Sequence, residues 1–120
     1  MADAPASPLP LQTAQRYVAV AVADGKGDLA DLFAVDAEFH NPRGVIVRGR
    51  ENIRAFYDEH LANVIPAFHI SRSVVDGAQC WIELANGSPD APDLVAANHF
   101  TVGADGLITR LAVFLRPRPA

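Results

Sequence analysis

The chain has 120 residues, of which 50% are hydrophobic and 20% charged, and its formal net charge is −4. This composition predicts one globular domain with a real core and excludes a disordered chain. A sequence pI of about 5.4 and the lack of any Lys/Arg run argue against nucleic-acid binding. No run of about 18 apolar residues is present, so we expect no membrane partner.

Cysteine and histidine content is low. The single cysteine, Cys80, cannot form an intramolecular disulfide, and the four histidines are scattered along the chain. This pattern does not fit a zinc site, and we expect no metal and no cofactor. The N-terminus lacks the basic and apolar regions of a secretory signal, which favours a cytoplasmic protein.

Helical patterns occupy the first half of the chain. Residues 1–10 are rich in Ala and Pro and are expected to form a flexible tail before a single domain over residues 11–117. Residues 11–24 carry both a helical stripe and an alternation of valines. We favour a helix there because two glycines follow the segment.

Two further helices are expected. Asp28 is a good N-cap for a short second helix over residues 28–34. The third has the strongest period, with apolar residues recurring at helical spacing from Ile53 to Val64. It follows the turn residue Gly49 and is stopped by Pro66.

The apolar period then changes to two. Strands are expected at residues 67–75, 78–85, 94–102 and 107–116, after two short extended segments at 38–41 and 45–48. Asp76 and Gly77 predict a hairpin turn. Helices followed by antiparallel strands predict an α+β domain, in which the helices cover one face of a curved sheet and leave room for a pocket.

Side-chain alternation assigns the two faces of this sheet. Asn98 is the single polar side chain on the more apolar face of its strand, so that face is expected to line the pocket. A hairpin centred near Pro89 adds Cys80, Ile82 and Leu84 to the same face. The outer face then carries Trp81, Glu83, His99, Arg110, Ala112 and Phe114. This face is unusually apolar, and we expect a homodimer to form through it.

The element order, with the segments FHNPRGVIVRGRENIRAFY and NHFTVGADGLITRLAVFLRP, resembles the NTF2-like superfamily. The closest resemblance within it is to ketosteroid isomerase and the SnoaL-like polyketide cyclases, and it extends over about residues 11–117. It implies a cone of three N-terminal helices packed on a curved antiparallel sheet that encloses a pocket. This scaffold hosts isomerases, dehydratases, epoxide hydrolases, cyclases and proteins without activity.

The resemblance also implies roles for individual residues. Tyr17 matches the tyrosine that donates a hydrogen bond to the substrate carbonyl oxygen of the isomerases, and Asn98 replaces the protonated acid that is their second donor. Asn41 stands at the position of the aspartate base. Tyr57 matches a supporting tyrosine, and Phe33 replaces another.

The two amide replacements have different consequences. An amide N–H still donates, so Tyr17 and Asn98 could polarise a carbonyl. An amide takes no proton near neutral pH, so Asn41 cannot be the base, and steroid isomerisation by the family mechanism is not expected. Asn41 could instead orient a water or substrate, or bridge the turn before Pro42. His60, a water or the substrate itself would then transfer the proton.

We therefore expect a small hydrophobic molecule with a carbonyl or hydroxyl group as the ligand. Tyr17, Asn41, His60 and Asn98 are the catalytic candidates. The candidates for substrate binding are Phe33, Phe39, Phe56, Tyr57, Ile82, Phe100, Val113 and Leu115.

Three functions remain open at this point. Isomerase- or cyclase-type chemistry is the first hypothesis, and a non-catalytic binding or dimerisation module is the alternative. Epoxide hydrolysis is the third, because the limonene epoxide hydrolase branch also has an asparagine at the position of Asn41. That branch needs carboxylates and an arginine in the pocket, whereas Glu83 and Arg110 are expected on the outer face.

Overall fold

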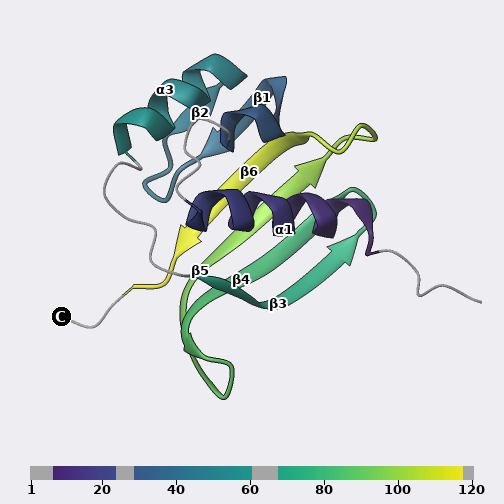
Figure 1. The fold of residues 1–120 in the computed structure, drawn as a ribbon. Coiled ribbons are helices and arrows are strands. Elements are labelled where there is room, and N and C mark those ends of the chain that lie inside the picture. The colour runs from purple at the N-terminus through teal and green to yellow at the C-terminus, as the bar shows by residue number, and fades with distance from the viewer. Residues whose placement is uncertain (1–6, 24–28, 61–67, 118–120) are drawn as a thin grey trace, which may run out of the picture.

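A six-stranded sheet forms the body of the protein in the computed structural model, which describes residues 7–23, 29–60 and 68–117 (Figure 1). Its strands are β1 (Phe33–His40), β2 (Ile46–Arg48), β3 (His69–Asp76), β4 (Gln79–Ser88), β5 (Ala91–Val102) and β6 (Ile108–Leu115). Their order across the sheet is β2-β1-β6-β5-β4-β3.

One strand pair corrects the expected all-antiparallel sheet, because β1 and β6 run parallel. The strands from β3 to β6 form an antiparallel meander. Its last strand, β6, lies beside β1 and runs in the same direction. The predicted hairpin between β3 and β4 is confirmed, and Gly77 adopts the positive φ of 58° that favours glycine in such a turn.

Two α-helices pack against the sheet. The helix α1 (Leu9–Val22) lies across β3, β4 and β5, and α3 (Arg50–His60) lies over β1 and β2 at the other end (Figure 1). The first helix begins earlier than predicted, since Pro10 fits its first turn, where a missing N–H costs nothing. The predicted continuation of the third helix to residue 64 lies outside the described residues.

The described residues hold two α-helices, and the expectation of three helices is corrected at the second one. Ala30–Leu32 forms a single turn of 3-10 helix, and β1 starts at Phe33, inside the expected helix. Residues 24–28 lie outside the described part of the chain. The apolar stripe here is too short to hold an α-helix by itself, whereas Phe33, Ala37 and Phe39 all bury their side chains in the extended conformation.

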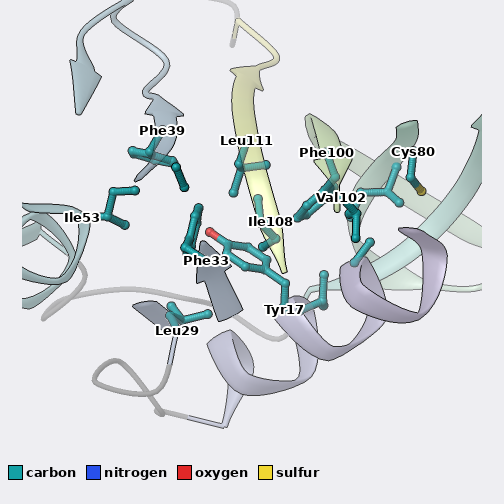
Figure 2. Close-up of a cluster of buried hydrophobic side chains, with 14 of the residues drawn as sticks. Tyr17, Leu29, Phe33, Phe39, Ile53, Cys80, Phe100, Val102, Ile108 and Leu111 are labelled. Carbon is teal, nitrogen blue, oxygen red and sulfur yellow. The ribbon is translucent and has the colours of Figure 1, made fainter. Parts of the chain in front are cut away.

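The core lies between the helices and the inner face of the sheet (Figure 2). Tyr17 extends from α1 into a cluster that includes Phe33, Phe100 and Ile108. Its ring makes edge-on contacts with Phe33 and Phe100, at centroid distances of 6.3 Å and 5.4 Å. No helix among the described residues has the length and hydrophobicity that a membrane crossing requires.

The predicted assignment of the sheet faces is confirmed around Asn98, because Asn98 pairs with Ile82 on β4 and with Val113 on β6, so the three side chains share one face. It is wrong at the start of β5, where alternation predicts Leu94 on the same face as Asn98. One irregularity departs from simple alternation. Leu84 pairs with Ala96 while Ala85 pairs with Leu94, so Val95 is an extra residue in β5. This β-bulge reverses the alternation for the first part of the strand.

Candidate binding pocket

A pocket of about 630 Å³ opens between the two helices and the inner face of the sheet. Its wall is mostly apolar, with contributions from α1, α3 and strands β1, β4, β5 and β6. The predicted residues that line it are Tyr17, Phe39, Phe56, Tyr57, Asn98, Val113 and Leu115. A pocket of this size and character suits a small hydrophobic molecule.

The tyrosines from the two helices meet at this pocket. The hydroxyl oxygens of Tyr17 and Tyr57 lie 2.6 Å apart and share a hydrogen bond. Burial raises the pKa of Tyr17 to about 12, and burial together with Tyr17 raises the pKa of Tyr57 well above its usual value. Both hydroxyls therefore stay protonated at neutral pH. Only one of their two protons is used between them, which leaves one for a ligand.

Asn98 also belongs to the wall, which further includes the polar residues Asn86 and Arg116, and 2% of Asn98 is exposed. Its Oδ1 is fully buried and has no hydrogen-bond partner in the described part of the chain. An unpaired buried amide oxygen costs about 1–3 kcal/mol of stability. Since the O and N atoms of an amide exchange places by rotation about one bond, this side chain can offer a ligand a donor or an acceptor.

Three of the predicted lining residues lie behind the wall rather than on it. Phe33, Ile82 and Phe100 are fully buried core residues and are not part of the pocket surface. Phe33 and Phe100 pack against the ring of Tyr17, so they fix the direction of its hydroxyl from behind. These two residues therefore position Tyr17 without contacting the pocket themselves.

The side chain of Asn41 bridges a turn. Its Oδ1 accepts hydrogen bonds from the backbone N–H groups of Arg43 and Val45, at 2.9 Å and 3.0 Å. The neighbouring Pro42 lines the pocket, but Asn41 does not. The structure thus places Asn41 in the turn-bridging arrangement that was one of its two sequence interpretations.

His60 lies at the end of α3, exposed and outside the pocket wall. Its ring stacks on Phe56 at a centroid distance of 4.2 Å, and its Nδ1 lies 3.0 Å from the Phe56 carbonyl oxygen. Phe56 itself lines the pocket, so His60 reaches the site only through that ring. No His, Asp or Glu side chain belongs to the described pocket wall.

The sequence analysis missed several wall residues, among them Val18, Ala21 and Val22 on α1, which lie near Tyr17 on the helix. Helical spacing from Tyr17 could have identified Ala21. Val95 and Ala96 both line the pocket, although they are consecutive. The β-bulge makes this arrangement possible, and nothing in the sequence marks it.

The outer face of the sheet carries the polar groups that epoxide hydrolysis would need in the pocket. Glu83 lies 3.9 Å from Arg72 there, and Arg110 donates a hydrogen bond of 3.2 Å to Nδ1 of His99. Trp81 stands 4.7 Å from the His99 ring. Neither Glu83 nor Arg110 belongs to the pocket wall.

Comparison with known proteins agrees with this architecture. The family model for the SnoaL-like domain matches residues 14–111. No curated protein matches the chain. The fold and its pocket therefore define an NTF2-like α+β domain, and this chain belongs to the SnoaL-like family.

Solved structures show the same fold. RV0760c from Mycobacterium tuberculosis is 17% identical with a TM-score of 0.76, and the match covers 94% of this chain and 95% of that one. A Kribbella flavida protein, provisionally described as a ketosteroid isomerase, is 19% identical with a TM-score of 0.68, over 93% and 84% of the two chains. SalBIII, an epoxide hydrolase/cyclase-like enzyme of pyran ring formation in salinomycin, is 15% identical with a TM-score of 0.70, over 89% and 90%.

Proposed function

We propose that this protein binds a small hydrophobic molecule and holds its carbonyl or hydroxyl oxygen against Tyr17, Tyr57 and Asn98. The observation that carries the proposal is the set of these three polar side chains, called the polar group below. A shared tyrosine hydrogen bond and an unpaired buried amide oxygen stand on the wall of a mostly apolar pocket. A ligand hydroxyl there would donate to Oδ1 of Asn98, whereas a ligand carbonyl oxygen would accept the remaining tyrosine proton and, with the amide turned over, an Nδ2–H of Asn98.

The same arrangement supports isomerase- or cyclase-type chemistry. Hydrogen-bond donors that point at a carbonyl oxygen stabilise the negative charge that develops when a neighbouring C–H bond loses its proton. Tyr17 and Tyr57 are protonated donors at neutral pH because burial raises both pKa values. The proton would go to water or to a group of the substrate, since the described wall carries no carboxylate or imidazole.

A second candidate, a binding protein without catalysis, is favoured by that missing base. Without a proton acceptor, the polar group would fix the orientation of a ligand and do nothing more. Both candidates require the pocket and the tyrosines, and they differ only in turnover. Two measurements therefore test them in sequence.

The first measurement is a binding titration with a naphthol, followed by the fluorescence of the ligand. Trp81 is a poor reporter for it, since it lies on the outer face. Tyr17→Phe and Tyr57→Phe should each weaken binding about three- to tenfold, the contribution of one hydrogen bond. Thr109→Val is the matched control, because it removes a hydroxyl hydrogen bond far from the pocket wall. Undiminished binding in both tyrosine variants would exclude the proposed polar group.

The second measurement is hydrogen–deuterium exchange at the carbon next to the carbonyl of a bound bicyclic ketone, followed by NMR. Exchange faster than in buffer, and lost in Tyr57→Phe, indicates enolate stabilisation and hence an enzyme. Tight binding of the ketone without faster exchange indicates the binding protein instead.

A further inference from the structure

We infer that the molecule bound in this pocket carries an anionic group, most simply a carboxylate, which Arg116 holds at the pocket mouth. This inference rests on the proposed function, because it concerns the other end of the same ligand. It follows from how polar groups are distributed along the pocket.

The two ends of the pocket differ in exposure and in charge. Tyr17, Tyr57 and Asn98 are buried residues of the wall. Leu115 and Arg116, which also line the pocket, are exposed and mark the end that opens to solvent. The buried end is neutral, whereas the open end carries a permanent positive charge.

Arg116 is the single charged residue of the described pocket wall. Within the described residues, its guanidinium has no ion pair and no hydrogen bond, as is also true of Arg16 and Arg43, which do not line the pocket. Other guanidinium groups are paired with carboxylates. Those pairs are Arg48 with Glu38, Arg54 with Asp31 and Glu51, and Arg72 with Glu83. The chain has more acidic than basic residues, 14 against 10, yet the wall near this arginine includes no carboxylate.

The backbone holds Arg116 in a defined place. Its N–H donates a 2.9 Å hydrogen bond to the carbonyl oxygen of Val95, the bulged residue of β5. Val95 precedes Asn98 by three positions on the same strand, which corresponds to about 10 Å. A molecule as long as two or three fused rings could therefore reach Asn98 with one end and Arg116 with the other.

The chemical class follows from these constraints. The ligand has an apolar body that fills the pocket, a carbonyl or hydroxyl oxygen at the buried end, and a carboxylate at the open end. Arginine pairs with carboxylates through parallel hydrogen bonds, and the apolar surroundings strengthen such a pair compared with one in free solvent.

A matched pair of probes tests the inference. One is a hydroxynaphthoic acid with its hydroxyl and carboxyl groups at opposite ends of the ring system, and the other is its methyl ester. We expect Arg116→Gln to weaken binding of the acid about fivefold and to weaken binding of the ester by less, because the ester carries no charge for Arg116 to pair with. Added salt should weaken binding of the acid to the unmodified protein more than to the variant. Arg72→Gln, on the outer face, is the control and should affect neither probe.

The outcomes separate this inference from the proposed function. If the ester binds and depends on Tyr17, but Arg116→Gln leaves the acid unaffected, the anionic group is excluded while the proposed function stands. If neither probe binds the folded protein, the proposed function fails, and this inference fails with it.

Discussion

The hydroxyl oxygens of Tyr17 and Tyr57 are 2.6 Å apart, although one residue comes from α1 and the other from α3. This hydrogen bond joins the two helices across the buried end of the pocket. Each ring is held by aromatic neighbours, Phe100 beside Tyr17 and Phe39 beside Tyr57, with centroid distances of 5.4 Å and 5.3 Å. The donor pair is thus positioned before any ligand arrives, which lowers the cost of binding.

The tyrosine pair should ionise late. The chain contains two tyrosines, so its whole tyrosinate absorbance reports on Tyr17 and Tyr57. Burial raises the pKa of Tyr17 to about 12, from 10.0 in the unfolded chain. The contribution of the protonated tyrosine to the free energy of unfolding is therefore fully present below about pH 10 and is lost as the pH rises towards 12. A spectrophotometric titration should show little tyrosinate below about pH 10, with its rise coinciding with unfolding followed by circular dichroism. A midpoint near 10 in the folded protein would contradict this burial.

Asn98→Leu should stabilise the folded protein and weaken its binding of ligand. The change removes the unpaired buried Oδ1 and keeps a side chain of similar shape, so we expect a gain of about 1 kcal/mol in the free energy of unfolding. Naphthol binding should weaken in the same variant. Urea unfolding and the ligand titration measure the two effects. A loss of stability would mean that the amide is satisfied in the unliganded protein.

Asn41 should matter for folding more than for chemistry. Asn41→Ala removes both hydrogen bonds to the turn and should cost about 1 kcal/mol, measured by urea unfolding. Asn41→Asp can still accept both bonds and should be nearly neutral. It should also fail to accelerate deuterium exchange in the bound ketone, because the side chain is committed to the turn. Faster exchange in Asn41→Asp would show that the carboxylate reaches the substrate, as the family position implies.

His99 should make the protein sensitive to mild acid. Burial and the nearby Arg110 lower its pKa below 6.5. As the pH falls from about 7 to 5, the unfolded chain takes up this proton first, so stability should decrease. Arg110→Gln should reduce this loss by removing one cause of the shift. Urea unfolding followed by Trp81 fluorescence measures both, since Trp81 lies 4.7 Å from the His99 ring. If both proteins lost the same stability between about pH 7 and pH 5, Arg110 would not be a cause of the lowered pKa of His99.

We expect the outer face of the sheet to mediate a homodimer. Trp81 and Phe114 are 44% and 52% exposed and lie 5.8 Å apart, and Val74 beside them is 66% exposed. Exposed apolar side chains gathered in this way are typical of an interface. Phe114→Glu should halve the mass measured by light scattering, whereas Asp90→Lys, at the tip of the β4–β5 hairpin, should not. A monomeric unmodified protein would refute the expectation.

Much of the fold was predictable because it depends on local periodicity. The two-residue alternation predicted Asn98 and Ile82 on the inner face of the sheet and Trp81 on the outer face. The strand register confirms both predictions. The second helix was mispredicted because three apolar residues fit a helical turn and a strand entrance equally well. Burial of Phe33 and Phe39 against other elements decided in favour of the strand.

The sequence by itself determined which side chains are chemically able to act: a tyrosine on each of two helices, an amide on an apolar strand face, and no aspartate before Pro42. Tertiary structure decided what those groups do. It brought the two hydroxyl oxygens to 2.6 Å from each other, held Asn41 in a turn by two hydrogen bonds, and placed Arg116 beside Val95 on the pocket wall. Periodicity describes one element at a time, whereas a site is made by distances between elements, and those are set only when the elements pack together.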